Sequence, residues 1–235
     1  LIDEGRTVGA VTILPSSEES VKSHINSYEC FTELTRISGS GACFIIDNEN
    51  GDKMELNASF VDSFDDFLMI PEKHKSVKGN IDKAEIMETL RAHGISVIAR
   101  SKSGESADII KSVKEGVFAP LAPDRAVKYI TASLAGNARM IDLERAFGTP
   151  IDNFQTFNEE KTICCMSGLT CPQTRLEAVY NKVAENEELI RQNLAATQET
   201  GLKRDVNFLA TLEPAKGKVA EKKPQSRRDI MSKYL

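Results

Sequence analysis

The sequence predicts an α/β protein in which a long helix connects two α/β layers. Two observations lead to this prediction. The short apolar runs 8–14 and 42–46 are typical of buried strands, and a helical stretch lies between them. Further on, Phe60, Phe64 and Phe67 recur at three- and four-residue spacing, which puts them on one face of a helix. Strands and helices that alternate along a chain favour layered α/β architectures.

The composition is that of a globular protein rather than a membrane or disulfide-rich one. The 235 residues include 40% hydrophobic and 28% charged side chains, which is enough for a substantial core. No apolar run approaches the roughly 20 residues that span a bilayer, and the polar opening LIDEGRT is not a signal peptide. The five cysteines show no disulfide pattern, which fits a reducing cytosol. We therefore expect a cytoplasmic protein without membrane contact, and its first residue, Leu rather than Met, suggests a fragment or a processed chain.

The first layer is expected to be a strand, helix, strand unit. Run 8–14 is a continuous apolar stretch, so we expect a strand buried on both faces. Ser16 or Ser17 is expected to cap a helix that runs to about Ile37. Run 42–46 is then the second strand, and a unit of this size predicts a crossover between two parallel strands.

The second layer follows the long helix, which is expected over 54–70. Pro71 is unfavourable inside a helix, and Gly79-Asn80 is a turn signal. Beyond the turn a further helix begins, and strands and helices then alternate, with strands expected at 95–100, 127–134 and 161–167 and helices at 104–118 and 141–147.

The C-terminal part combines a long charged helix with a basic tail. Pro172 is tolerated in the first turn of a helix that runs to about Thr197. Net charge is −5 overall, so the body does not bind nucleic acid by bulk charge, but lysines and arginines dominate over 201–235. We expect a mobile basic linker that ends in a short segment, 227–235, with apolar side chains at helical spacing. This tail could keep the protein soluble, bind DNA directly, or dock on a partner protein, and we favour docking.

Asp82 and Glu85 are the candidate catalytic residues. Three residues apart at a helix start, they face the same side. They could act on a molecule outside the chain, or simply stabilise the helix N-terminus, where acids are favoured. Asn48, which follows the second strand, lies where ligands of open α/β sheets bind.

Two other patterns carry no site. Ser38-Gly39-Ser40-Gly41 precedes a strand instead of opening a helix after one, so a turn is expected there and not a phosphate loop. Cys164, Cys165 and Cys171 have no histidine nearby, and two of them fall in an apolar strand, so we expect buried thiols and no metal site.

The order of these pieces carries a family resemblance. The chain begins with a strand, a helix and a second strand that ends in Asp47-Asn48. A long helix that contains Asn57 follows, and then the motif Asn80-Ile81-Asp82-x-x-Glu85. This order resembles the tubulin/FtsZ superfamily, and most closely its plasmid- and phage-borne TubZ branch. The resemblance covers nearly the whole chain. It implies five parts: the C-terminal half of a parallel-sheet GTP-binding domain (1–53), a long connecting helix and turn (54–79), a C-terminal activation domain of the α/β layer type (80–171), a long C-terminal helix (172–200) and a mobile basic tail (201–235).

The resemblance also implies a function. The protein would be a GTPase that polymerises head to tail into filaments for plasmid or phage DNA segregation in a bacterial host. Asp82 and Glu85 would act on the GTP of the adjacent subunit, while Asn48 and Asn57 would hold guanine and Glu19 would lie near the ribose. The tail would bind a DNA-binding adaptor protein. The alternatives are a filament or adaptor-binding subunit without its own nucleotide site, and an FtsZ-like protein of chromosomal cell division.

One departure from the family concerns the phosphates. The glycine-rich phosphate loop of the superfamily is missing and would lie upstream of Leu1, together with most of the groups that hold GTP/GDP phosphates and Mg²⁺. We therefore expect residues 1–235 to be inactive in GTP hydrolysis on their own.

Overall fold

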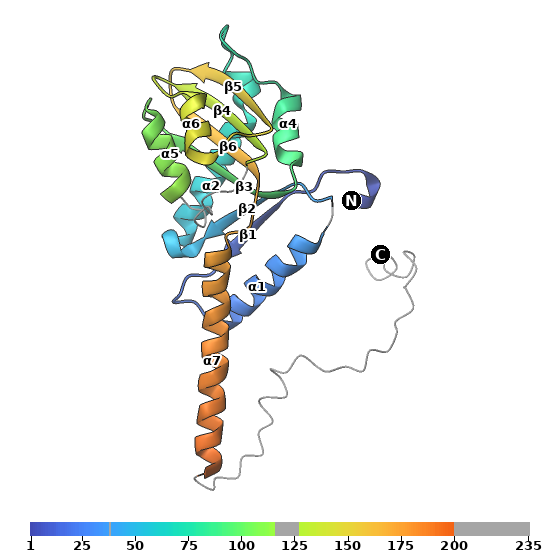
Figure 1. Ribbon diagram of the computed structural model, residues 1–235, viewed down its shortest axis with the longest axis vertical. Coiled ribbons are helices and arrows are strands. Elements are labelled where there is room, and N and C mark those ends of the chain that lie inside the picture. The colour runs from blue at the N-terminus through green and yellow to red at the C-terminus, as the bar shows by residue number, and fades with distance from the viewer. Residues whose placement is uncertain (38, 116–126, 200–235) are drawn as a thin grey trace. The chain divides into compact units, whose positions relative to one another are not determined.

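Six strands of the described residues form one mixed sheet with helices packed against it (Figure 1). The computed structural model describes residues 1–37, 39–115 and 127–199, except the side chains of 3, 194 and 196–199. The strands are β1 (Ala10–Leu14), β2 (Ala42–Asp47), β3 (Gly94–Ser101), β4 (Tyr129–Ala135), β5 (Asp152–Asn158) and β6 (Thr162–Leu169). The helices are α1 (Val21–Arg36), α2 (Lys53–Leu68), α3 (Ile70–Lys73), α4 (Lys83–Arg91), α5 (Ser106–Glu115), α6 (Met140–Phe147) and α7 (Gln173–Glu199), with short 3₁₀ turns η1 (Ile2–Glu4) and η2 (Asn48–Asn50).

The sheet order is β1-β2-β3-β6-β4-β5. β1, β2 and β3 run parallel, β6 is antiparallel to both of its neighbours, and β5 is parallel to β4. The α/β class and the parallel β1-α1-β2 unit are therefore confirmed. Residues 1–189 form one compact unit, and the described part of a second unit, from Ile190, is the end of α7. The predicted boundaries after residues 53 and 79 fall within the first unit and stay predictions.

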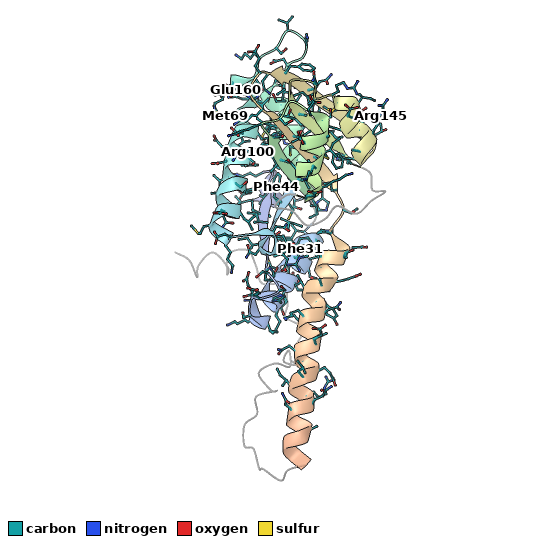
Figure 2. The ribbon with its side chains drawn as sticks, turned by 90° about the vertical axis from the view of Figure 1, so that its left-hand side faces the viewer. Phe31, Phe44, Met69, Arg100, Arg145 and Glu160 are labelled. Carbon is teal, nitrogen blue, oxygen red and sulfur yellow. The ribbon has the colours of Figure 1, made fainter. Side chains whose placement is uncertain are left out.

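The long helix α2 packs its aromatic face on the sheet. Phe44 of β2, labelled in Figure 2, meets two phenylalanines of α2 edge-on. Its ring centroid lies 5.4 Å from that of Phe60 and 5.6 Å from that of Phe64. Such pairs add stability beyond the area they bury. Phe67 is fully buried on the same face. The three phenylalanines whose spacing predicts this helix are therefore the residues that hold it to the sheet.

Ion pairs fix the C-terminal end of α2. Asp66 pairs with Arg100 of β3 at 3.1 Å and with Lys161, just before β6, at 2.5 Å. Burial raises the pKa of Asp66, but the hydrogen bonds from Lys161 and Arg100 outweigh it and hold this pKa below its usual value. The helix is thus tied to the sheet along its whole length.

The structure corrects two expectations about the first layer. β1 is not buried on both faces, because it is the edge strand and leaves Val11 51% and Ile13 48% exposed. The cap of α1 is Ser20, whose hydroxyl oxygen accepts from the backbone N–H of Ser23 at 3.2 Å, and not Ser16 or Ser17. Those two serines lie in the preceding loop, where carboxylates engage their backbone N–H groups.

β5 is absent from the predicted elements. Its sequence, DNFQTFN, has polar residues at five of seven positions and lacks the apolar run of an interior strand. It is the other edge of the sheet, where only alternate side chains such as Phe154 and Thr156 are buried. The predicted helix 104–118 ends at Glu115 within the described residues, and the predicted tail 201–235 lies outside them. In the part of the chain that the structure describes, no helix has the length and apolar character needed to cross a bilayer.

Candidate functional site

Glu19 and Asn48 meet at the carboxyl ends of β1 and β2. The Asn48 amide Nδ2 donates to Glu19 Oε1 at 2.8 Å, and the Ser16 backbone N–H donates to the same oxygen at 3.1 Å. Lys53 Nζ lies 3.1 Å from it. Burial raises the pKa of Glu19, but the hydrogen bonds from Asn48, Lys53 and Ser16 together outweigh it, so the pKa is lowered. Glu19 is therefore held as a carboxylate.

A second carboxylate closes the loop between β1 and α1. Glu49 of η2 accepts from the Ser17 backbone N–H at 2.6 Å and from the Ser17 hydroxyl at 2.9 Å. The backbone hydrogen bond from Ser17 is the largest cause that lowers the pKa of Glu49. The two loops that follow β1 and β2 are thus joined by two charge-assisted contacts, Glu19 to Asn48 and Ser17 to Glu49.

Arg175 of α7 ties these loops to the C-terminal helix. Its guanidinium donates to both carboxylate oxygens of Asp47, at 2.7 and 3.0 Å, and to the Pro15 carbonyl oxygen at 2.6 Å. The Asp47 side chain is only 3% exposed and that of Arg175 only 13%. The ion pair between Asp47 and Arg175 is not among the contacts expected from the sequence. A carboxylate at the end of a buried strand requires a cation, which is the signal that could have revealed it.

Asn57 lies on α2, which packs against η2, and is half-buried. Its amide makes no hydrogen bond to another described residue. An amide offers one acceptor and two donors, so Asn48 and Asn57 could match the mixed edge of a nucleobase. The structure brings Glu19 and Asn48 into direct contact and places Asn57 on the helix that follows η2.

Asp82 and Glu85 form a capping box at the start of α4. Asp82 Oδ1 accepts from the Glu85 backbone N–H at 2.9 Å, and Glu85 Oε2 accepts from the Asp82 backbone N–H at 2.8 Å. The local interpretation of this pair, a stabilised helix N-terminus, is therefore present in the structure. The second oxygen of each carboxylate makes no hydrogen bond to another described residue. Asp82 is exposed, so its free oxygen is open to solvent.

The two groups of residues belong to opposite edges of the sheet. Glu19 and Asn48 follow β1 and β2, whereas the loop that leads to Asp82 rests on β5 through Gly79. Gly94 pairs with Ala42, so only the C-terminal end of α4, at Arg91, approaches the amino end of β2. A side chain on Gly41 would meet the Leu90 carbonyl oxygen at 2.5 Å, which confirms this approach. Glu19 and Asn48 follow the carboxyl ends. Figure 1 shows α4 and the turn between β1 and α1 on opposite sides. The carboxylates of α4 therefore do not face this chain's own Glu19–Asn48 pair.

The chain is similar in sequence and in structure to known proteins. No protein-family model matches the chain. It is 26% identical over 202 residues to the tubulin-like protein TubZ of Clostridium botulinum C phage, which covers 81% of this chain and 54% of that protein. The crystal structure of Clostridium botulinum phage c-st TubZ matches with a TM-score of 0.71 at 20% identity, over 79% of this chain and 63% of that chain. This chain is similar to TubZ in sequence and has the fold of the TubZ structure.

A third comparison agrees. The GDP-form protofilaments of Bacillus thuringiensis serovar israelensis TubZ match with a TM-score of 0.67 at 16% identity, over 86% of this chain and 63% of that chain. The TubZ-like chain thus spans between about half and two thirds of the length of these relatives.

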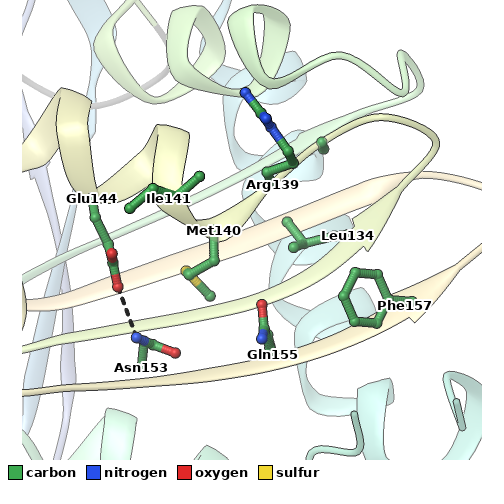
Figure 3. A pocket seen from close by; sticks show the side chains of 9 residues that line it. Leu134, Arg139, Met140, Ile141, Glu144, Asn153, Gln155 and Phe157 are labelled. Atoms are coloured by element: carbon green, nitrogen blue, oxygen red, sulfur yellow. Dashed lines mark hydrogen bonds between the residues drawn. The ribbon is translucent and has the colours of Figure 1, made fainter. Parts of the chain in front are cut away.

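A groove of about 380 Å³ lies between α6 and β5 of the TubZ-like chain (Figure 3). Met140 and Ile141 form its helical side, and Gln155 and Phe157 its strand side. Glu144 accepts a hydrogen bond of 2.7 Å from the Asn153 amide at one end. Arg139 and Glu144 are the charged residues that line the groove.

Two of the three thiols expected to be buried are buried, whereas Cys171 is only partly buried. Cys164 and Cys165 of β6 are fully buried, and burial raises the pKa of Cys164 to about 12. Thiols with such a pKa are inert. Among the described residues, no group of three His, Cys, Asp or Glu side chains could hold a metal ion.

Proposed function

We propose that this TubZ-like protein acts in a self-assembling GTPase filament, in which Asp82 and Glu85 act on the GTP of the adjacent copy. The observation that carries the proposal is the opposite placement of α4 and the Glu19–Asn48 pair. Copies stacked head to tail would bring the carboxylates of one to the nucleotide end of the next. The protofilament arrangement of the TubZ relative supports this stacking.

The Glu19–Asn48 end suits the base and ribose of GTP or GDP. Asn48 and Asn57 offer amide donors and acceptors for guanine, and Glu19, held ionised, offers an acceptor for a ribose hydroxyl. The described residues do not suit the phosphates or Mg²⁺, because they contain no glycine-rich turn that opens a helix and no cluster of metal ligands. We therefore assign no step to Mg²⁺, and we expect residues 1–235 to show no GTP hydrolysis by themselves.

The capping box prepares the carboxylates for this reaction. Each uses one oxygen to hold the other's backbone N–H, which fixes both side chains and leaves one oxygen each for solvent. A carboxylate fixed in this way can orient the water that attacks the γ-phosphate and accept its proton. Positioned acid–base groups typically contribute about 10²–10⁴-fold to a rate.

Two substitutions of Asp82 separate catalysis from capping. Asn is as good a cap as Asp but lacks the charge, whereas Ala loses both. In the complete gene product, we expect Asp82→Asn and Asp82→Ala each to lower the GTP hydrolysis rate about 100-fold or more, with polymers that still sediment. We expect only Asp82→Ala to destabilise the fold, by about 0.5–2 kcal/mol. Wild-type hydrolysis by Asp82→Asn would leave capping as the whole function of this residue.

A second candidate function is a filament or adaptor-binding subunit without catalysis. The observation that favours it is the capping box itself, because both carboxylates already have a structural task. In that case Asp82→Asn would change neither hydrolysis nor assembly.

DNA segregation is the proposed cellular purpose, with the tail as the link. Segment 201–235 lies outside the described residues, and its support is compositional: it is rich in lysine and arginine and ends in RRDIMSKYL. We propose that it binds a DNA-bound adaptor protein. Deleting residues 227–235 should abolish co-sedimentation of adaptor with filaments, and unchanged co-sedimentation would exclude this segment.

A further inference from the structure

The two ends of the loop that leads to Asp82 both contact one hydroxyl of β5, that of Thr156. The loop connects α3 to α4 and turns through a bridge between Ser76 and Gly79. Its tip is solvated, since Val77 is fully exposed. The Thr156 hydroxyl lies 3.0 Å from the His74 carbonyl oxygen and 2.9 Å from that of Gly79. One hydroxyl hydrogen is therefore shared between the two ends of the loop.

His74 extends this contact into a buried polar network. Its Nδ1 lies 2.8 Å from the Ser133 hydroxyl, and Ser133 is the direct neighbour of Thr156 across the β4–β5 pair. The Asn158 amide donates to Ser133 Oγ at 2.8 Å and to the Lys161 carbonyl oxygen at 2.9 Å. Ser133 accepts from Asn158, and its own hydrogen is available for His74 Nδ1, an arrangement that suits a neutral imidazole with its hydrogen on Nε2.

The centre of this network is buried. Thr156 and Ser133 are fully buried, and His74 is 7% exposed. The Asn158 side-chain oxygen accepts from the backbone N–H groups of Glu160 and Lys161, so this amide is satisfied on both sides. Buried hydrogen bonds of this kind fix the geometry of the groups that they join.

The loop backbone rests directly on β5. A side chain on Gly79 would lie 2.7 Å from the Gln155 carbonyl oxygen, so only glycine allows this approach. Two residues later Ile81 is fully buried, and Asp82 begins the capping box. The position of the Asp82 carboxylate is therefore set by three successive anchors: the Gly79 carbonyl on Thr156, the Ile81 side chain in the core, and the cap.

We propose that Thr156 and His74 are positioning residues for Asp82 and Glu85, through the loop that they fix. This inference rests on the proposed function, because it specifies what holds the two carboxylates in their working geometry. Neither residue touches the nucleotide end of the molecule. Their loss should therefore affect the chemical step and not the binding of nucleotide.

Substitution of Thr156 in the complete gene product tests the inference. Val has a similar volume but no hydroxyl, whereas Ser keeps it. We expect Thr156→Val to lower kcat for GTP about 10- to 100-fold while KM stays within about twofold, and Thr156→Ser to remain within about threefold of wild type. The control is Ser96→Ala, which removes a buried hydroxyl of β3 that has no hydrogen-bond partner among the described residues, and should leave kcat unchanged.

A second readout does not depend on hydrolysis. Hydrogen exchange at the backbone amides of Asp82 and Glu85 reports whether the cap is held. We expect Thr156→Val to accelerate this exchange about tenfold, and Thr156→Ser and Ser96→Ala to leave it unchanged. If Thr156→Val fails to fold, Gly79→Ala should give the same acceleration and the same loss of kcat, because it pushes the loop off β5.

The outcomes separate the two claims. Unchanged kcat and unchanged amide exchange in folded Thr156→Val or Gly79→Ala overturn the positioning inference, even where Asp82→Asn abolishes hydrolysis. Thr156→Val could instead show faster amide exchange while Asp82→Asn hydrolyses GTP at the wild-type rate. That result would show that Thr156 holds the loop. It would overturn the proposed catalysis by Asp82, and with it the catalytic role of the loop contact.

Discussion

Asp82 and Glu85 show how far single residues can be understood from spacing. Three-residue separation at a helix start predicts that both side chains face one way, and the capping box fulfils that geometry. The spacing alone leaves open whether the pair caps or catalyses. The structure leaves one oxygen of each carboxylate unpaired among the described residues, so both tasks are compatible.

Contacts between residues far apart in the sequence were harder to predict from the sequence. Asn48 was predicted at a strand end, where ligands of such sheets bind, and the structure places it there. Its bond to Glu19 joins residues 29 positions apart and depends on how two loops fold back. His74 looks isolated in the sequence, and its partner Ser133 is 59 residues away.

His74 gives a pH dependence of stability. Burial is the main cause that lowers the pKa of His74 below its ordinary 6.5. Its other charged surroundings are Glu160 and Asp66, which raise the pKa, and Lys161 and Lys73, which lower it. The unfolded chain therefore binds a proton near pH 6.5 that the folded chain does not, so stability falls as the pH drops below 6.5.

Urea unfolding of residues 1–235 at several pH values between about 5 and 7.5 measures this slope, above the range where carboxylates titrate. His74→Gln should flatten it, while His93→Gln, an exposed control at the other end of α4, should not. An equal slope in wild type and His74→Gln would contradict the prediction.

At the level of elements, the interior strands, the strand β1 and the long helices were predictable, whereas the edge position of β1 and the strand β5 were not. β2 and α2 follow their apolar pattern closely. β1 has the apolar run of an interior strand but lies at the edge, and β5 has the polar composition of a loop but pairs along its whole length with β4. The burial of a strand depends on which strands lie beside it in the sheet. The local sequence of a strand does not specify those neighbours.

The junction of α7 with the sheet carries an element-scale prediction. Arg175→Met should destabilise residues 1–235 by about 3–5 kcal/mol, because it leaves the buried Asp47 carboxylate without its cation. Lys182→Met, which removes an exposed charge from the same helix, should change stability by less than about 0.5 kcal/mol.

A double substitution identifies the cause. In Asp47→Asn/Arg175→Met the loss should be smaller than the sum of the two single losses, because neither charge is left unpaired. Urea denaturation measures all four proteins. Additive losses would show that Arg175 stabilises α7 by packing alone.

For the whole molecule, the sequence predicted an α/β protein that resembles the tubulin/FtsZ superfamily, and the chain has the fold of the TubZ structure. The merging of all six strands into one sheet was not predictable, because β6 returns antiparallel between β3 and β4 from far along the chain. This arrangement sets the loop that leads to Asp82 and the Glu19–Asn48 pair at opposite edges of the sheet. The proposed catalysis between copies depends on that separation.

Mixed assembly tests catalysis between copies most directly. Asp82→Ala copies of the complete gene product should bind GTP but lack the Asp82 carboxylate. Asn48→Ala copies should supply both carboxylates but bind guanine poorly. Each variant alone should hydrolyse GTP about 100-fold more slowly than wild type or worse. A mixture that co-sediments should partly recover hydrolysis, because intact Asp82 reaches GTP on a neighbouring copy. A co-sedimenting mixture without recovery would contradict the account, since the carboxylates would then act within one chain or not at all.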